Sequence, residues 1–106
     1  MAAPSLLFQV EHQDGETRLT IGGEIDNTTA QALEERATSL LSSRPSVLVL
    51  DFSGVVFCDS SGIAAILRTY NKALPRGTRL SIEHTSPHVR KVFEVVGLTR
   101  LLATQP

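Results

Sequence analysis

Hydrophobic and polar residues alternate in the first quarter of the chain, a pattern typical of half-buried β-strands. The alternation occupies LLFQVEH and then TRLTIGGEI, and Asp14-Gly15 between the two segments is a strong signal for a tight turn. The sequence therefore predicts two strands joined at this turn. The apolar positions expected to face the core are Leu6, Phe8, Val10, Leu19, Ile21 and Ile25.

The pattern then changes to a helical period, which predicts an amphipathic helix. Asp26-Asn27 before the periodic residues is a suitable N-cap. Ser42-Ser43-Arg44-Pro45 after them ends the helix, because proline cannot continue it. The apolar positions of this helix are Ala30, Leu33, Ala37, Leu40 and Leu41.

Two later segments repeat the helical period. One follows Gly62 and ends at Pro75-Arg76-Gly77, and the other opens with Ser86 as N-cap and Pro87 at the first helical position. Gly97 stands directly after the latter helix, where a left-handed backbone suits glycine. The expected apolar faces are Ile63, Ile66, Leu67, Tyr70 and Leu74 in one helix, and Val89, Val92, Phe93 and Val96 in the other.

Apolar runs between the helices predict further strands. VLVLDF, residues 47–52, is a nearly continuous apolar run that suits a central strand buried on both faces. Ser53-Gly54 is expected to end this strand, and RLSIEH predicts another strand with Leu80 and Ile82 inward. The order β-β-α-β-α-β-α implies right-handed crossovers. We therefore expect one α/β domain over residues 1–106, with a short C-terminal tail at 98–106.

Polar chemistry is concentrated in Cys58-Asp59-Ser60-Ser61-Gly62, between an apolar strand and a helix. Because the helical period begins at Ile63, Asp59 is expected to be the N-cap, with its carboxylate accepting from the N–H of Ser61 or Gly62. Ser60 and Ser61 then become the first two helical residues, at the positive end of the helix dipole. This junction follows the carboxyl end of a strand, where α/β proteins commonly place their sites.

Four interpretations of Asp59-Ser60-Ser61-Gly62 are open on chemistry alone. The motif can simply cap a helix, or it can bind an anion, although Asp59 would repel the anion and no Walker-type loop is present. A nucleophilic serine would need a base from His12, His84 or His88, and the chain has no G-x-S-x-G motif. A serine here can also accept a regulatory phosphate. The fold tolerates a dianion at a helix N-terminus, and the added charge changes the surface that a docked partner contacts.

Composition narrows the class of partner. Ten Lys and Arg residues against 11 Asp and Glu give a net charge of −1, which leaves no basic footprint for nucleic acid or for an anionic membrane. Cys58 is the only cysteine, so neither a disulfide within the chain nor a cysteine zinc cluster is possible. The sequence lacks a secretory signal pattern and an apolar run long enough for membrane insertion. We expect a cytoplasmic protein that binds another protein and needs no cofactor or metal.

Several segments together resemble the STAS domain family, and within it the bacterial anti-sigma factor antagonists. The matching segments occur in the family's order over nearly the whole chain. The resemblance implies a STAS-like α/β fold, with a four- to five-stranded mixed sheet and helices packed mainly on one face. The residues that carry it are Gly23-Glu24-Ile25-Asp26, the apolar strand 47–52, Val55 to Ile63 with its Asp-Ser-Ser-Gly, Ser86-Pro87 to Phe93, and Gly97-Leu98.

The resemblance also implies a partner-switching regulator of transcription rather than an enzyme. In such systems the unphosphorylated antagonist binds an anti-sigma factor, itself a serine kinase, and so frees a sigma factor in the stress response. Carried onto this chain, Ser60 is the phosphoacceptor, and a PP2C-type phosphatase reverses its phosphorylation. The expected partner-binding residues are Asp26, Asp59, Ser61 and Gly62, and capping of the first helix is the other interpretation of Asp26.

A second function stays open, because the same fold also serves as a non-phosphorylated subunit of stress-signalling or lipid-transport assemblies. The tail after Gly97 is shorter than the family's final strand and helix, so Leu98, Leu101 and Leu102 are expected to cover the sheet instead. Cys58 replaces a larger apolar residue, and we expect a small buried side chain rather than a redox sensor. The sequence does not distinguish a monomer from a dimer.

Overall fold

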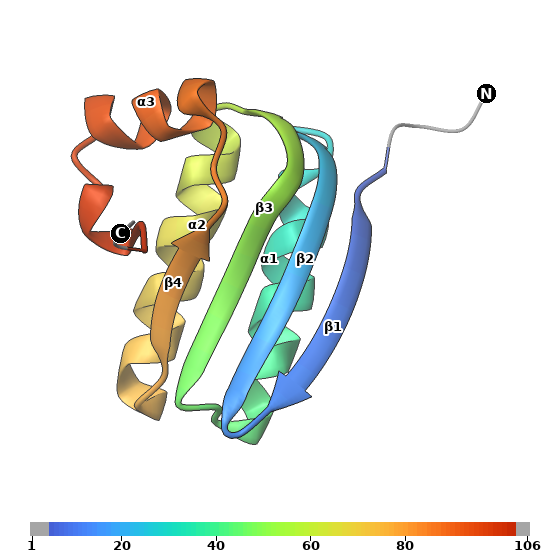
Figure 1. Ribbon diagram of the computed structural model, residues 1–106, viewed down its shortest axis with the longest axis vertical. Helices are drawn as coiled ribbons and strands as arrows, with labels where there is room; N and C mark the ends of the chain where they lie inside the picture. Colours follow the sequence, from blue (N-terminus) through green and yellow to red (C-terminus); the bar gives the residue numbers. More distant parts are fainter. Residues whose placement is uncertain (1–4, 104–106) are drawn as a thin grey trace.

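The computed structural model describes residues 5–103, which form one mixed sheet of four strands in the order β1-β2-β3-β4 (Figure 1). β1 and β2 pair antiparallel, whereas β2, β3 and β4 are parallel. The expected mixed α/β sheet is therefore confirmed. The strands are β1 (Leu7–Gln13), β2 (Glu16–Ile25), β3 (Val47–Cys58) and β4 (Arg79–Glu83).

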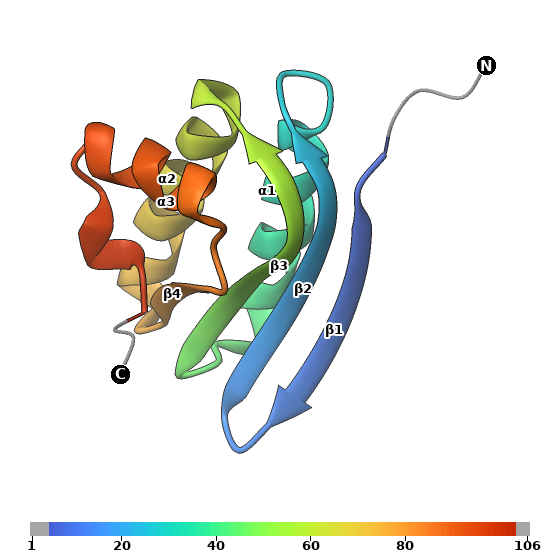
Figure 2. The ribbon, with the colours of Figure 1, turned by 45° about the horizontal axis from the view of Figure 1, so that its top comes forward.

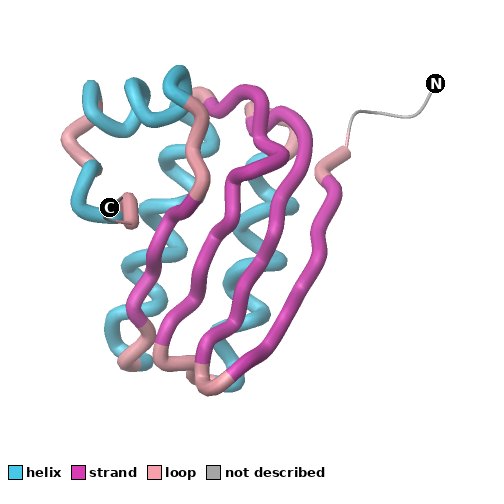
Figure 3. The backbone as a smooth tube through the Cα atoms, viewed as in Figure 1, coloured by secondary structure: helices cyan, strands magenta, loops and turns pink. Residues whose placement is uncertain are grey.

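The two longer helices, α1 (Ala30–Leu40) and α2 (Ser60–Ala73), lie side by side on one face of the sheet (Figures 1 and 3). α3 (Pro87–Val95) lies at the end of the sheet where α2 begins, as Figure 2 shows. Each helix is followed by a short 3-10 turn. These turns are η1 (Leu41–Ser43), η2 (Leu74–Arg76) and η3 (Thr99–Leu101).

The turns and caps that the sequence predicts are largely present. Asp14 and Gly15 have φ of 52° and 81°, the left-handed pair that a two-residue hairpin turn requires. Ser86 accepts a hydrogen bond from the Val89 N–H as the N-cap of α3. Gly97 follows that helix with φ of 76°.

β3 does not end at Ser53-Gly54, so that prediction is wrong. The strand continues to Cys58, because Gly54 faces Gly22 of β2 and a Cβ on Gly54 would lie 3.0 Å from the Gly22 Cα. The two glycines let the strands stay close while their register shifts. Here glycine marks an irregularity inside a strand rather than its end.

The core fills the space between the sheet and the helices. Phe52 of β3 and Phe93 of α3 meet edge to face, with ring centroids 6.3 Å apart. This contact holds α3 against the end of the sheet. The largest fully buried side chains include Phe52, Phe93, Leu19, Ile21, Ile25, Leu33, Leu41, Leu48, Leu50, Ile66 and Ile82.

The apolar face of α2 is rotated relative to the prediction. Leu67 and Leu74 are 36% and 56% exposed, whereas Thr69 and Ala73 are buried. Thr69 is accommodated because its hydroxyl donates to the Ala65 carbonyl at 2.8 Å. Small buried side chains let α2 approach closely, and this leaves the leucines outside. Val96, also expected in the core, is 47% exposed.

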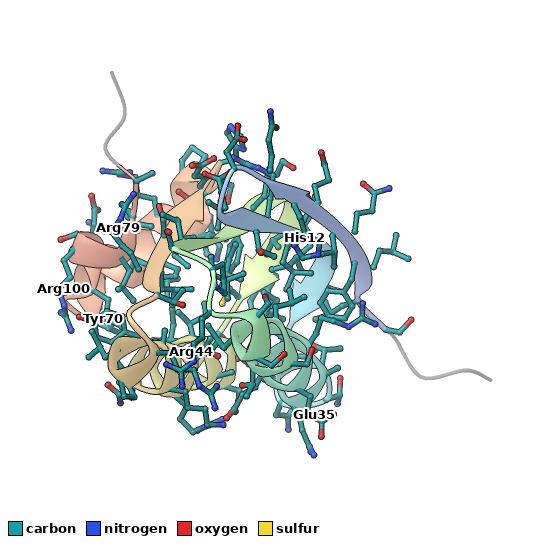
Figure 4. All side chains as sticks on the ribbon, turned by 90° about the horizontal axis from the view of Figure 1, so that it is seen from below. His12, Glu35, Arg44, Tyr70, Arg79 and Arg100 are labelled. Carbon is teal, nitrogen blue, oxygen red and sulfur yellow. The ribbon has the colours of Figure 1, made fainter. Side chains whose placement is uncertain are left out.

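The C-terminal segment covers the outer edge of β4. Leu98 and Leu101 are buried, and the Ala103 N–H donates to the Ile82 carbonyl at 2.8 Å. The Arg100 guanidinium lies over the Tyr70 ring of α2, 5.6 Å from its centroid, as the view from below shows (Figure 4). The expected covering role is confirmed for the described part of the tail, and residues 104–106 lie outside the described range.

Candidate functional site

The carboxyl ends of β2 and β3 bring the predicted site residues together. Ile25 and Cys58 pair at the ends of the two strands, and the Asp59 N–H donates to the Ile25 carbonyl at 3.1 Å. Asp26 and Asp59 directly follow this pair of residues, so both lie at the same edge of the sheet. This edge is at the top of Figure 1, where α2 begins.

Asp59 is the N-cap of α2, as predicted. Its Oδ1 accepts hydrogen bonds from the N–H groups of Ser61 at 2.9 Å and Gly62 at 3.3 Å. Its backbone is extended, and its carbonyl accepts from the Ile63 N–H. The cap therefore fixes the path of the chain on both sides of Ser60.

Ser60 is the first residue of α2, and it is exposed. Among residues 5–103 no side chain hydrogen-bonds to its hydroxyl, so this oxygen faces water. Ser61, the next residue, is half-buried and lines the groove between α1 and α2. The two neighbouring serines thus differ in their exposure to solvent.

Gly62 is buried where the first turn of α2 crosses the end of β3. A Cβ at this position would lie 2.6 Å from the Cys58 Sγ and 2.6 Å from the Ile25 Cγ2. Only glycine fits without a shift of its neighbours. Cys58 itself is 1% exposed, and burial raises the pKa of its thiol to about 12. The expected small buried side chain is confirmed.

Asp26 does not cap α1, so that interpretation is wrong. The helix begins three residues later than this cap would require, and its N-cap is Thr29. Asp26 Oδ1 instead accepts from the Thr28 hydroxyl at 2.6 Å and from the Thr28 N–H at 2.8 Å. These bonds, led by that of the hydroxyl, lower the pKa of Asp26 below its usual value of 3.8. Asp26 is therefore held as a carboxylate in a tight loop beside Asp59.

The other interpretations of the motif find little support in the geometry. His12 contacts Thr17, His84 contacts Asp51, and His88 stacks on Phe57, so in the described range no imidazole hydrogen-bonds to Ser60. Anion binding is disfavoured because the Asp59 carboxylate already accepts from the N–H groups of Ser61 and Gly62 in the first turn of α2. Residues 5–103 hold no group of three or more metal-ligating side chains, and no helix among them is long and apolar enough to span a membrane.

A groove runs from Ser61 along the outer side of α1 and α2. It is open to solvent and encloses about 870 Å³. Glu34 of α1 joins the two helices across it, accepting from Arg68 at 2.7 Å and from Lys72 at 3.1 Å. These ion pairs hold the groove walls together on the side of α2 that carries Ser61.

The exposed side chain of Phe57, beside the site, was not predicted from the sequence. Phe57 is 36% exposed, and its ring stacks on His88 of α3, with centroids 6.4 Å apart. Phe57 lies beyond the predicted end of the strand at Ser53-Gly54, in a short apolar run that gives no sign of exposure. The signal that could have revealed its exposure is the irregularity at Gly54, after which Val56 and Phe57 both point outward.

Comparisons with known proteins agree with this architecture. A sequence profile described as "Mlab, STAS domain" matches residues 8–103. The anti-sigma-F factor antagonist RsfB of Mycobacterium tuberculosis is 33% identical over 101 residues, which cover 94% of this chain and 82% of that protein. An anti-sigma-B factor antagonist of Bacillus subtilis is 25% identical over 93 residues, covering 88% of this chain and 84% of that protein.

Solved structures give the same result. An anti-sigma factor antagonist from Mycobacterium paratuberculosis matches with a TM-score of 0.83 and 31% identity, covering 100% of this chain and 91% of that chain. The unphosphorylated form of SpoIIAA, an anti-sigma factor antagonist, matches with a TM-score of 0.80 over 94% of this chain and 89% of that one. At 22% identity the SpoIIAA match concerns the fold alone. The profile match over nearly the whole described chain, together with a relative above 30% identity, shows that this chain belongs to the STAS domain family.

Proposed function

We propose that this chain is an anti-sigma factor antagonist switched by phosphorylation of Ser60. The unphosphorylated form binds an anti-sigma factor that is also a serine kinase, and a sigma factor is thereby released. A PP2C-type phosphatase restores this form after the kinase has modified it. The proposal draws on relatives named as antagonists of anti-sigma factors and on the geometry around one hydroxyl.

The observation that carries the proposal is the exposed Ser60 hydroxyl on a rigid connection. A kinase needs a serine oxygen that it can reach, and Ser60 stands in water at the first position of α2. The Asp59 cap and the buried Gly62 hold the backbone on both sides of this serine. The acceptor loop, defined here as residues 59–62 (the N-cap and the first three residues of α2), therefore has a fixed backbone path on both sides of Ser60.

Phosphorylation changes the charge of this surface without a need to change the fold. The Ser60 oxygen attacks the γ-phosphorus of ATP, ADP leaves, and the hydroxyl proton passes to a base of the kinase. The product carries roughly −1.5 to −2 charge and three acceptor oxygens. The carboxyl groups of Asp26 and Asp59 flank this serine, and residues 59–62 contain no cationic side chain that could pair with the new group. The acceptor loop therefore does not neutralise the added charge, and the effect of phosphorylation falls on the binding of the partner.

The test is phosphorylation with matched serine variants. Each anti-sigma factor kinase of the organism that encodes this chain is incubated with ATP and with wild type, Ser60→Ala or Ser61→Ala. Wild type and Ser61→Ala should take up one phosphate, which mass spectrometry of peptides locates at Ser60. Ser60→Ala should remain unmodified. Equal modification of Ser60→Ala and wild type would refute the assignment.

A second candidate function is that of a non-phosphorylated subunit in a stress-signalling or lipid-transport assembly. The profile description "Mlab, STAS domain" is the observation that favours it. An affinity pull-down with the unmodified chain separates the two functions. Recovery of an anti-sigma factor kinase supports the switch, whereas recovery of a transporter ATPase supports the second function.

A further inference from the structure

Another pocket lies between the C-terminal end of α2, the outer edge of β4 and the segment that follows α3. It encloses about 500 Å³, within the range of small-molecule sites. Because Ser60 begins α2, this pocket lies about 15–20 Å along the helix from the acceptor loop. We call it the Tyr70 pocket, and its apolar lining comes from Tyr70, Leu74, Leu80, Leu101 and Leu102.

Two arginines that line the Tyr70 pocket have no acidic partner among residues 5–103. Arg79 begins β4 and Arg100 lies in η3, and both are exposed. All 11 Asp and Glu residues of the chain lie within 5–103, so none is left outside that range to pair with them. The pocket is therefore positively charged, although the chain as a whole carries −1. The cations that do form ion pairs in this range are Arg18, Arg68, Lys72, His84 and Arg90.

The Arg100 side chain is held in place while most of its hydrogen-bond donors stay available. Its guanidinium lies over the Tyr70 ring, on the side of the molecule where Figure 4 also shows Arg79. A guanidinium in this position keeps the N–H groups along its edge free for an acceptor. Its hydrogen bond within residues 5–103 is a long one, 3.5 Å from Nη1 to the Gly97 carbonyl. Ser81, which is 6% exposed, lines the same pocket and adds a hydroxyl donor.

We infer that the Tyr70 pocket binds a small anion with an apolar body, whose head is a carboxylate or a phosphate monoester. Arg79 and Arg100 pair with the anionic head, and the leucines of the lining contact the apolar body. The pocket is bordered on three sides by α2, β4 and the C-terminal segment, which suits a small molecule better than the surface of a protein. Arg76 in η2 compensates the negative end of the nearby α2 dipole, which would otherwise oppose an anion. Binding here needs neither Ser60 nor an anti-sigma factor.

The chain carries its own reporter for this pocket. Tyr70 is the only tyrosine and tryptophan is absent, so the fluorescence of the protein comes chiefly from a residue of the pocket. The probes are octanoate and octyl phosphate at pH 7. Acetate and inorganic phosphate lack the apolar body, and octan-1-ol lacks the charge. At least one octyl anion should change the fluorescence saturably and bind at least about tenfold more tightly than the three controls. The octyl anion with the higher affinity identifies the preferred head group.

Variants of the arginines test how the anionic head is bound. Arg79→Gln and Arg100→Gln should each weaken binding of the octyl anion about tenfold, because each removes a hydrogen bond to a charged group. Arg79→Lys and Arg100→Lys keep the positive charge and should lose less, about threefold. Arg44→Gln is the matched control, since Arg44 is also exposed and forms no ion pair within residues 5–103 but lines a different pocket. It should bind like wild type. Urea unfolding checks that each variant is folded.

Several results would overturn the inference. The absence of a saturable response to either octyl anion would do so directly. Equal affinity for acetate or inorganic phosphate would reduce the site to exposed positive charge, and equal affinity for octan-1-ol would make it purely apolar. Unchanged binding in both Arg→Gln variants would place the ligand elsewhere. Sedimentation covers a second copy of the chain as the occupant: a dimer that Arg100→Gln dissociates would assign the pocket to an acidic side chain of that copy. None of these results bears on the proposed function, because no kinase enters the experiment.

Discussion

Gly62, in the first turn of α2, lies directly against Cys58 at the end of β3. A Cβ on Gly62 would come within 2.6 Å of the Cys58 Sγ, and hydrogen in its place leaves the two elements in contact. The start of α2 is thereby held close to the sheet. Since Ser60 lies two residues earlier in the same turn, this contact also sets how far its hydroxyl stands from the surface.

Gly62→Ala is expected to destabilise the fold. Alanine favours helices over glycine by up to about 1 kcal/mol, but the added methyl meets the Cys58 Sγ and the Ile25 Cγ2. Overpacking of this kind costs about 1–3 kcal/mol, so the clash outweighs the helix preference. Urea unfolding measures the difference. In a Cys58→Ala background, which removes the Sγ, Gly62→Ala should cost less stability than it costs in wild type. A Gly62→Ala protein as stable as wild type would contradict the packing argument.

Cys58 should react very slowly with thiol reagents in the folded protein. Its thiol is buried, and burial, followed by the negative charge of Asp59, raises its pKa to about 12. Since the thiolate is the reactive form, about one thiol in ten thousand is reactive at pH 8. Reaction with a chromogenic disulfide should therefore be at least about a hundred times slower than in urea. Equally fast labelling of the folded and unfolded chains would instead support the redox-sensor interpretation.

Local signals predicted most of the elements, because each combines a clear period with a strong cap or turn. Asp14-Gly15 and Asp59 illustrate this: both act through their own backbone and their nearest neighbours. The position of α2 could not be predicted in the same way. Whether Leu67 or Thr69 faces the sheet depends on how closely the helix approaches, and that distance is set by contacts with Cys58 and Ile25.

The candidate site was likewise predictable only where its features depend on neighbouring residues in the sequence. The N-cap and the two serines follow from the local motif, whereas the stack of Phe57 on His88 joins segments that only the folded sheet brings together. Asp26 shows a further limit of predicting helix caps from the sequence. An aspartate before a helix suits an N-cap, but here Thr29 occupies that position and Asp26 closes the preceding loop.

Asp51 of β3 forms a charged network that the pattern of apolar residues concealed. It is buried, and Arg18 of β2 donates to its Oδ2 at 2.9 Å while the Ser53 N–H donates to its Oδ1 at 2.9 Å. His84 lies 3.1 Å from the same Oδ1. Burial raises the pKa of Asp51, but hydrogen bonds from Ser53, His84 and Arg18 outweigh burial and bring it below 3.8.

Asp51→Asn should therefore destabilise the protein in a pH-dependent manner. A carboxylate whose pKa is depressed by folding stabilises the fold above its unfolded pKa, and this contribution is lost as the pH falls through the folded value. We expect a loss of about 1–3 kcal/mol at pH 7 that shrinks below about pH 4. Urea unfolding across this range gives the profile, with exposed Glu35→Gln as the control. A loss that stays constant into acid would contradict the ionic origin of the effect.

Ser60→Asp should separate the switch from the stability of the fold. The side chain is exposed at a helix N-terminus, so the added charge should change the free energy of unfolding by no more than about 0.5 kcal/mol. Binding to the anti-sigma factor should weaken by at least about 1–3 kcal/mol, the scale of an unpaired charge at a buried contact. Ser60→Asn has the same shape without the charge and should bind more tightly than Ser60→Asp. Urea unfolding and binding titrations on the same samples test both statements, and equal affinity of the Asp and Asn variants would mean that bulk rather than charge operates the switch.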